Sequence, residues 1–280
     1  MNVRIVVDST ADIIPEVRDR LTVVPLTVHF GEEEYVDGVT ITHKQFYEKL
    51  VECDVLPTTS QPTPEAFADI FRQAEAADEQ VVVLTISSKL SGTCQSATIA
   101  AADFPGRVWV VDTCSVAIGA GILAELALQL ADEGLDAPAI AARLEVEREK
   151  VRVIALLDTL EYLKKGGRIS KTVAFAGGIL SIKPVITLQD GEVAILGKAR
   201  GSKQGNNLLI TEIQKAGGVD FSKPVLLGYT GMSDVLLTKY IEDSKHLWEA
   251  GLEKVRYTTI GSVIGTHAGP GAVAAAFFTK

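Results

Sequence analysis

Residues 81–112 have the sequence VVVLTISSKLSGTCQSATIAAADFPGRVWVVD, and this stretch decides the fold class. Two short apolar runs, Val81–Ile86 and Val108–Asp112, flank a helical stretch around residues 93–103. Buried parallel strands are typically apolar in this way, because helices cover both faces of their sheet. The stretch therefore predicts a strand–helix–strand unit of a parallel sheet.

The rest of the first half repeats this alternation. Two helices carry start signals, since Thr42-x-x-Gln45 is a capping box and Thr63-Pro64 is a typical first turn. We therefore predict an α/β fold whose N-terminal part, residues 1–158, is a three-layer α/β/α domain around a parallel sheet. Its remaining strands and helices are expected at Val3–Val7, Leu21–Phe30, 116–132, 138–149 and Val151–Leu157.

The pattern changes after about residue 158. Asp190-Gly191 lies between two strand-like runs, Ile182–Leu188 and Val193–Arg200, which is a strong signal of an antiparallel hairpin. Gly166-Gly167 is expected to end a short helix. We predict a second, smaller α/β domain with a mixed sheet over residues 159–280, and a ligand between the two domains. Its other elements are expected near 203–216, Val225–Tyr229, 233–248, 254–260 and 272–278.

Composition excludes several classes of protein. Of the 280 residues, 47% are hydrophobic and 22% charged, which is typical of a globular protein with a substantial core. The net charge of -9 would repel nucleic acid. The apolar stretch Val116–Ala131 is too short to span a bilayer, and no export signal precedes Val3–Val7. We expect a cytoplasmic protein without a nucleic-acid partner or an integral membrane segment.

The cysteines and histidines do not form a metal pattern. The three cysteines are far apart, without a C-x-x-C pair, and the four histidines occur singly. We therefore expect no metal, no disulfide framework and no cofactor. A P-loop and a kinase glycine-rich loop are also absent from the sequence.

Hydroxyl-rich segments follow the expected strands or precede the expected helices. They are Asp8-Ser9-Thr10, Pro57–Pro64, Ser87–Thr93 and Asp112–Ser115. Helix N-termini with free N–H groups and hydroxyl donors form an anion site if they converge. Helix capping by single hydroxyls, such as that of Thr63, explains the same residues.

Arg168 and His267 are the remaining candidates for binding an anion. Arg168 follows two glycines and has the best-shaped cation for a carboxylate, although it could equally belong to a solvated basic helix end. His267 lies in a segment with Gly265, Gly269 and Gly271, which we interpret as a loop thin enough for a ligand head group to approach. Alone, His267 could be a structural histidine, but beside two hydroxyl loops and an arginine a ligand contact is favoured.

Eight short motifs together resemble the DegV family of bacterial fatty-acid-binding proteins, in the same order and nearly from end to end. They are Asp8-Ser9-Thr10-Ala11-Asp12, Tyr35-Val36-Asp37-Gly38, Thr58-Thr59-Ser60-Gln61-Pro62, Leu90-Ser91-Gly92-Thr93 with Gln95-Ser96-Ala97, Gly166-Gly167-Arg168-Ile169, Ser181-Ile182-Lys183-Pro184, Lys198-Ala199-Arg200-Gly201 and Ile264–Gly271.

The resemblance implies a long-chain fatty acid buried between two domains. Members with known roles carry the substrate of a fatty acid kinase, whose ATP-binding subunit phosphorylates the carboxylate to an acyl phosphate for phospholipid synthesis. The fold is also similar to the substrate subunit of dihydroxyacetone kinase. Arg200 would lie where the family meets its kinase. By motif, the carboxylate contacts here would be Thr59 or Ser60, Ser91 with Gly92 and Thr93, Arg168 and His267.

Two alternatives remain open at this point. Small residues in Ala117–Leu123 and Ala174–Leu180 could leave a channel for the lipid tail, but they equally permit close helix packing. The chain could also be a serine-dependent hydrolase or acyltransferase, with Ser91 or Ser88 as nucleophile and His267 as base. The carrier hypothesis predicts instead a lipid-binding protein that makes no bonds itself.

Overall fold

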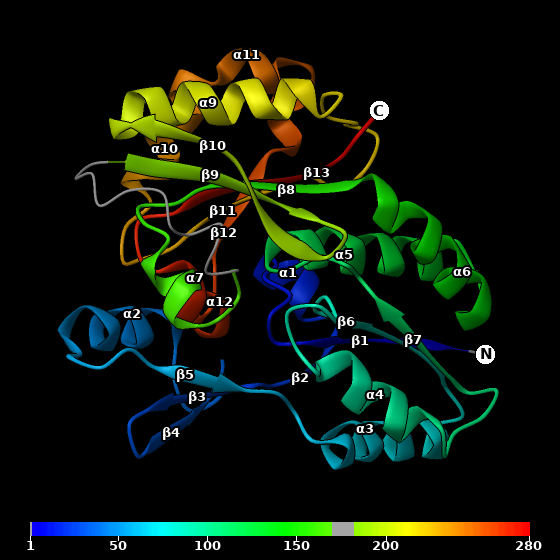
Figure 1. Ribbon diagram of the computed structural model, residues 1–280. Coiled ribbons are helices and arrows are strands. Elements are labelled where there is room, and N and C mark those ends of the chain that lie inside the picture. Colours follow the sequence, from blue (N-terminus) through cyan, green and yellow to red (C-terminus); the bar gives the residue numbers. More distant parts are fainter. Residues whose placement is uncertain (1, 170–181) are drawn as a thin grey trace.

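The computed structural model describes residues 2–169 and 182–280, which form a mixed α/β fold (Figure 1). The predicted parallel sheet is present, with its described strands in the order β2-β1-β6-β7. Helices α3 and α4 pack on one face, and α5 and α6 pack on the other. The elements of this part are β1 (Val3–Asp8), α1 (Pro15–Arg18), β2 (Thr22–Val24), α3 (Pro64–Ala76), β6 (Gln80–Thr85), α4 (Thr93–Ala101), β7 (Val108–Asp112), α5 (Ile118–Asp132), α6 (Ala137–Glu147) and a 3-10 turn (Arg148–Lys150).

Both predicted helix start signals are confirmed. The Thr42 side chain accepts from the Gln45 backbone N–H, and the Gln45 side chain accepts from the Thr42 backbone, so α2 (His43–Glu52) begins with a complete capping box. Thr63 caps α3 through the Ala66 N–H, with Pro64 as the first helical residue.

The mixed sheet of the second half is also present. Its described strands run in the order β10-β9-β8-β13-β11-β12, and the predicted hairpin turns at Asp190-Gly191. Pairing is antiparallel except between β11 and β12. The elements here are β8 (Val151–Leu156), α7 (Glu161–Lys165), β9 (Ile182–Gln189), β10 (Glu192–Arg200), α9 (Gly201–Lys215), β11 (Leu226–Tyr229), α10 (Val235–Asp243), α11 (Lys245–Trp248), a 3-10 segment (Glu249–Lys254), β12 (Arg256–Thr259), α12 (Ser262–Ala268) and β13 (Val273–Phe278).

The predicted place of the strand Val151–Leu157 was wrong. It forms β8, which pairs antiparallel with β9 and β13 in the mixed sheet and not with the parallel strands. The physical reason is that β8 is buried on both faces, with Ala155 in the core beneath α5 and Ile154 in the core beneath α9. Such a run looks the same in either kind of sheet. The division of the chain at residue 158 stays a prediction.

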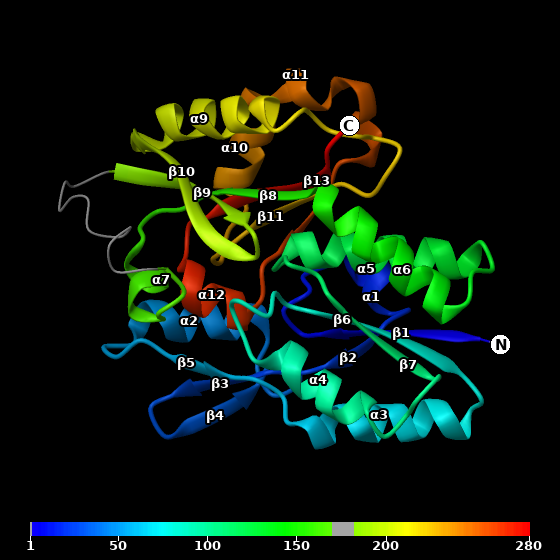
Figure 2. The same cartoon turned by 45° about the vertical axis from the view of Figure 1, so that its right-hand side comes forward.

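Helix α5 lies between the two large sheets, as Figures 1 and 2 show. It contacts β1 and β6 of the parallel sheet on one side and β8, β11 and β13 of the mixed sheet on the other. Helices α9, α10 and α11 cover the opposite face of the mixed sheet, where they bury Leu209, Tyr240 and Trp248. Helix α5 therefore packs against both large sheets.

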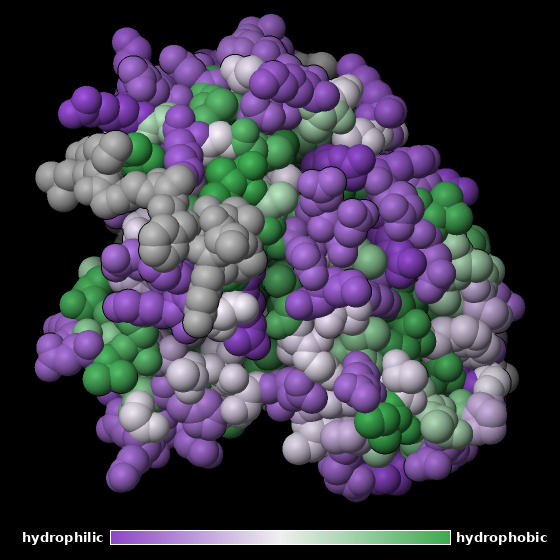
Figure 3. Space-filling view, in the orientation of Figure 1, coloured by the Kyte–Doolittle hydropathy of each residue, from purple (hydrophilic) through white to green (hydrophobic). Residues whose placement is uncertain are grey.

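A small antiparallel sheet, ordered β4-β3-β5, lies beside this arrangement; its strands are β3 (Thr27–Phe30), β4 (Glu33–Val36) and β5 (Thr58–Ser60). One face packs against α2 and α12, with Val28, Phe46 and Val263 in a shared core. Figure 3 shows apolar residues in the indentation between the mixed-sheet half and the rest of the molecule. The candidate site lies between these halves.

Candidate functional site

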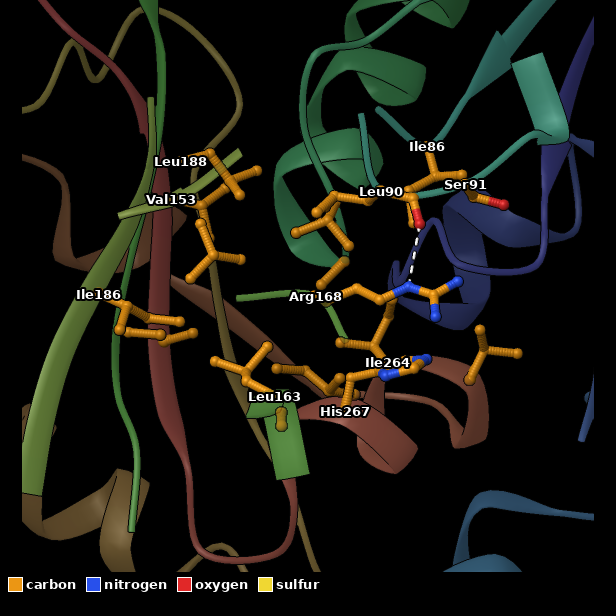
Figure 4. A pocket seen from close by; sticks show the side chains of 18 of the residues that line it. Ile86, Leu90, Ser91, Val153, Leu163, Arg168, Ile186, Leu188, Ile264 and His267 are labelled. Atoms are coloured by element: carbon orange, nitrogen blue, oxygen red, sulfur yellow. Dashed lines mark hydrogen bonds between the residues drawn. The ribbon is translucent and has the colours of Figure 1, made fainter. Parts of the chain in front are cut away.

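A cavity of about 380 Å³ lies where the mixed sheet, α12 and the small sheet meet the end of the parallel sheet. That volume is within the range of small-molecule sites. Figure 4 shows its two ends: Ser91, Arg168 and His267 gather on one side, while Val153, Ile186 and Leu188 lie on the other. Its lining is Leu26, Thr59, Ser60, Gln61, Ile86, Leu90, Ser91, Val116, Ala117, Val153, Ala155, Leu157, Leu163, Arg168, Ile186, Thr187, Leu188, Val193, Ile260, Val263, Ile264, His267, Ala268, Ala272 and Ala274.

Small residues of the mixed sheet make room for the apolar end. Gly228, Ala274 and Ala155 are direct neighbours across β11, β13 and β8, and Ile186 of β9 continues the row. Ala274 and Ala155 line the cavity. Larger side chains at these positions would fill the space above the sheet. The sequence did not predict that the alanine-rich segment of β13 lines a cavity, because alanine carries no group that indicates ligand binding.

The stretch Ala117–Leu123 serves both roles that the sequence left open. Ala117 lines the cavity at the start of α5. Gly119 and Gly121 permit close packing, because an added Cβ would lie 2.1 Å from Val153 Cγ2 or 2.1 Å from the Asp12 carbonyl oxygen. The second stretch, Ala174–Leu180, lies outside the described residues.

Thr59 and His267 meet at the polar end of the cavity. The Thr59 Oγ1 and the His267 Nε2 are 3.1 Å apart, although 208 positions separate the residues in sequence. Ser60 is different, since its hydroxyl is 2.6 Å from the His29 Nε2. Neighbouring side chains of a strand point to opposite faces, so the hydroxyl of Ser60 points away from that of Thr59. Of the two alternatives, the geometry favours Thr59 as the hydroxyl contact.

Ser91 lies in the loop that leads into α4. Its Oγ is 2.9 Å from the Thr93 Oγ1 and accepts from the Thr93 backbone N–H at 3.3 Å. Thr93 is fully buried, and neither Thr93 nor Gly92 belongs to the cavity lining. They lie behind Ser91 and orient it at the N-terminal end of α4, where the helix dipole favours an anion.

Gln61 is a site residue that the sequence did not single out by its chemistry. An added Cβ on Gly92 would lie 2.2 Å from the Gln61 Oε1, so the amide occupies the space that glycine leaves. The Gln61 Nε2 donates to the Ser96 Oγ at 3.0 Å. Gln61 thus joins the strand of Thr59 to the helix that follows Ser91.

Arg168 reaches into the cavity from the turn that ends α7. Gly167 has φ +69°, a conformation that favours glycine, so the chain reverses directly before the arginine. The guanidinium donates through Nε to the Leu90 carbonyl at 3.1 Å and through Nη1 to the Gly166 carbonyl at 2.7 Å. These two bonds fix its direction (Figure 4). Arg168 is therefore a cation aimed at the cavity and not a solvated helix end.

His267 lies on a helix, so its predicted loop was wrong. Gly265 lets helix α12 pack closely on α2, because an added Cβ would lie 2.6 Å from the Tyr47 Oη and 2.7 Å from the Phe46 Cε1. Gly261 directly precedes the helix, and its N–H donates to the buried carboxyl group of Asp12 at 2.7 Å. Gly265 is therefore a packing position, whereas Gly269 (φ +71°) and Gly271 (φ +81°) lie beyond the end of α12.

Burial is the main cause, and the nearby Arg168 guanidinium the second, of a His267 pKa that is lowered to about 4. The ring is therefore neutral at pH 7. Its Nδ1 is buried without a hydrogen-bond partner among the described residues, and an added Cβ on Gly166 would lie 2.2 Å from it. Within residues 2–169 and 182–280, the hydroxyl at hydrogen-bond distance from His267 is that of Thr59, and no hydrogen bond joins His267 to Ser88 or Ser91.

Two hydroxyl segments do not line this cavity. Asp8 accepts from the backbone N–H of Thr10 at 2.9 Å and of Ile86 at 2.7 Å, which ties the ends of β1 and β6 together. Asp112 accepts from the backbone N–H of Cys114 at 2.9 Å. Both carboxylates stabilise the sheet edge that carries the site.

Arg200 does not belong to the lining of the cavity. It is exposed at the end of β10, directly before α9. Ser181, the first residue of one recognised motif, lies outside the described residues. In residues 2–169 and 182–280, we find no helix long and apolar enough to cross a membrane and no cluster of three or more potential metal ligands.

Comparison with known proteins supplies the family. Residues 2–280 match the model of a family described as "Uncharacterised protein, DegV family". The chain belongs to the DegV family. The predicted resemblance and the α/β fold class are thereby confirmed.

Solved DegV structures share the whole fold. A fatty-acid-binding DegV protein from Thermus thermophilus is 36% identical, with a TM-score of 0.88 over 99% of this chain and 100% of that one. A stearic-acid-binding protein from Eubacterium ventriosum is 27% identical, with a TM-score of 0.85 over 99% and 98%. The fatty acid kinase B3 protein of Streptococcus pneumoniae, loaded with linoleic acid, has a TM-score of 0.87 over both whole chains; at 22% identity it shows the fold alone.

Proposed function

We propose that this DegV protein binds a long-chain fatty acid in the cavity between its two halves. The carboxylate would contact Thr59, Ser91, Arg168 and His267, with Gly92 and Thr93 supporting Ser91. The observation that carries the proposal is a cavity whose lining is mostly apolar, Thr187 apart, except at the end where these side chains meet. The fatty acids bound by the Thermus thermophilus and Eubacterium ventriosum proteins support it.

The chemistry of the polar end suits a carboxylate and not a neutral head group. A buried carboxylate stays ionised only when a cation and hydrogen-bond donors surround it. Arg168 supplies the cation, and the Thr59 and Ser91 hydroxyls supply donors. The apolar wall contributes binding free energy for the acyl chain, because burying each CH₂ is worth about 0.8 kcal/mol before entropic costs.

The neutral imidazole of His267 can donate one hydrogen bond to the bound carboxylate. The negative charge of that carboxylate favours the protonated ring, so the pKa of His267 should rise from about 4 on binding. The role assigned to His267 is recognition, and bond making would be left to a partner protein.

The partner that we propose is the ATP-binding subunit of a fatty acid kinase, which acts in the cytoplasm where ATP is available. A carboxylate oxygen would attack the γ-phosphorus of ATP, the bond between that phosphorus and the bridging oxygen would break, and ADP would leave with the bridging electrons. The product is an acyl phosphate, a precursor for phospholipid synthesis. The motif Lys198–Gly201 and the name of the Streptococcus pneumoniae neighbour support this step.

Lipid extraction tests the binding role. The purified protein, extracted with organic solvent and analysed by mass spectrometry, should release about one fatty acid per chain, and the stripped protein should bind added oleate or palmitate. Methyl oleate should bind much more weakly, because it carries no charge for Arg168. Neither released nor rebound fatty acid would refute the proposal.

A reconstituted kinase reaction tests the partner. With the ATP-binding subunit, ATP and oleate, the protein should support ATP-dependent formation of acyl phosphate, trapped as the hydroxamate. Arg200→Ala should slow the reaction while oleate affinity stays unchanged, whereas Lys203→Ala, one turn along α9, should not. Equal rates for the two variants would remove Arg200 from the proposed interface.

A further inference from the structure

The tip of the β9–β10 hairpin is bonded to the loop that leads from β6 to α4. The Ser87 Oγ donates to the Gly191 carbonyl at 2.7 Å, and Ser87 is fully buried. Gly191 has φ +81°, and a Cβ there would lie 2.5 Å from the Ser87 Oγ. Figure 2 shows the hairpin turning down toward this loop. The contact therefore requires both a hydroxyl at 87 and a glycine at 191.

Ser87 also organises the loop on its other side. Its Oγ accepts from the Lys89 N–H at 3.2 Å, and its carbonyl accepts from the N–H groups of Leu90 at 2.9 Å and Ser91 at 3.2 Å. The Leu90 carbonyl in turn accepts from the Arg168 guanidinium. The turn that presents Ser91 and fixes Arg168 is thus folded around Ser87.

The two parts that Ser87 joins both contribute side chains to the lining of the cavity. Ile186, Leu188 and Val193 belong to the hairpin, while Ile86 and Leu90 belong to the loop. The hairpin side lies at the apolar end, away from Arg168 and His267 (Figure 4). One buried hydroxyl consequently connects the wall over the lipid tail to the turn that holds the carboxylate contacts.

We infer that Ser87 is a positioning residue that holds the β9–β10 hairpin over the acyl chain and so sets how long the ligand stays bound. The inference rests on the proposed function, since it concerns retention of the same fatty acid. Loss of the hydroxyl leaves the Gly191 carbonyl without its donor, and the hairpin tip then separates from the loop more often. The effect should fall on long chains that reach the hairpin and spare short ones.

The test compares Ser87→Ala with Ser88→Ala, a neighbouring exposed serine whose side chain is outside the cavity lining. In protein stripped of lipid, hydrogen exchange measured by mass spectrometry should be faster in peptides covering 188–194 for Ser87→Ala and unchanged for Ser88→Ala. Stopped-flow release of a fluorescent long-chain fatty acid should be about tenfold faster for Ser87→Ala alone, the cost of about one buried hydrogen bond. Octanoate affinity should be unchanged for Ser88→Ala, and for Ser87→Ala it should change less than the affinity for long chains.

Gly191→Ala provides a second variant acting from the other side of the contact. Its Cβ should displace the hairpin and speed release of long chains, and the added effect should be smaller in the Ser87→Ala background, where the colliding oxygen is gone.

Equal exchange in the Ser87 and Ser88 variants would overturn the inference. A similar loss of octanoate and long-chain affinity in Ser87→Ala would also overturn it, since that pattern indicates a disturbed turn at Ser91 and Arg168. If the unsubstituted protein fails to bind any fatty acid, the proposed function fails, while the exchange experiment still decides whether Ser87 fastens the hairpin.

Discussion

Arg168 is the residue whose loss should weaken fatty-acid binding most. Among the described residues that line the cavity it carries the only permanent positive charge. We predict that Arg168→Gln lowers oleate affinity about 10- to 100-fold, because hydrogen bonds to charged groups contribute about 1.5–3 kcal/mol. Isothermal titration measures the change. Lys165→Gln, an exposed residue of the same helix end, is the control, and equal affinities for the two variants would contradict the role.

His267 should make the stability of the lipid-free protein depend on pH. Its folded pKa of about 4 is below the unfolded value of 6.5, so the unfolded state takes up a proton first as the pH falls. The free energy of unfolding should therefore decrease from pH 6.5 to pH 4, by on the order of 3 kcal/mol, and then level off. Urea unfolding at several pH values measures this.

His267→Gln is the matched control for that experiment and should flatten the profile between pH 6.5 and 4. Saturating fatty acid should flatten it as well, because the bound carboxylate raises the pKa of the ring. Identical profiles for the two proteins would show that another group titrates in this range.

At the residue scale, motifs predicted better than single residues did which side chains meet at the candidate site. Thr59, Ser91, Arg168 and His267 lie together, although nothing in their spacing brings them near each other. Ser60 could not be separated from Thr59 in advance, because strand register decides which hydroxyl points inward. Gln61 was missed because an amide carries no charge and gives no pattern.

Helix α12 should be sensitive to the size of residue 265. Gly265→Ala places a methyl group within 2.6 Å of the Tyr47 Oη and should cost about 1–3 kcal/mol of stability, since both aromatic neighbours are fully buried. Oleate affinity should fall too, because α12 carries His267. Thermal unfolding and titration measure the two effects. Ser202→Ala, at an exposed position of α9, should change neither, and a stable Gly265→Ala protein would argue against close packing of α12 on α2.

At the scale of elements, those with strong local signals were predictable, whereas which elements lie beside each other was not. The hairpin at Asp190-Gly191 and the caps at Thr42 and Thr63 are local, so the sequence contains all their causes. The sheet to which β8 belongs depends on which strands pair with it. An apolar run that is buried on both faces does not indicate its partners. The sequence predicts a loop at α12, because three closely spaced glycines indicate a flexible backbone. In the structure one of them, Gly265, lies within the helix and permits close packing.

For the whole molecule, the row of small residues across the mixed sheet should set the capacity of the cavity. We predict that Ala274→Val and Ala274→Phe lower oleate affinity progressively, with the phenylalanine reaching at least about tenfold, because the added side chain takes the space of the lipid tail. Octanoate affinity should change less. Thermal unfolding shows whether each variant is folded, and unchanged oleate affinity in a folded Ala274→Phe protein would contradict this position of the tail.

The overall architecture was only partly predictable. Alternating strands and helices indicated the parallel sheet, and the hairpin indicated the mixed one, but nothing local shows that α5 packs between both sheets. Its nearly continuous apolar sequence is explained by this position, since 11 of its 15 residues are buried. A helix apolar all round is buried all round.

The contact between Thr59 and His267 also has a consequence for biosynthesis. Because 208 positions separate the two side chains, a nascent polypeptide on the ribosome must be extended beyond His267 before its carboxylate site is complete. If the proposed binding is correct, a ribosome-bound chain arrested before α12 should therefore fail to retain lipid even after its parallel sheet has formed.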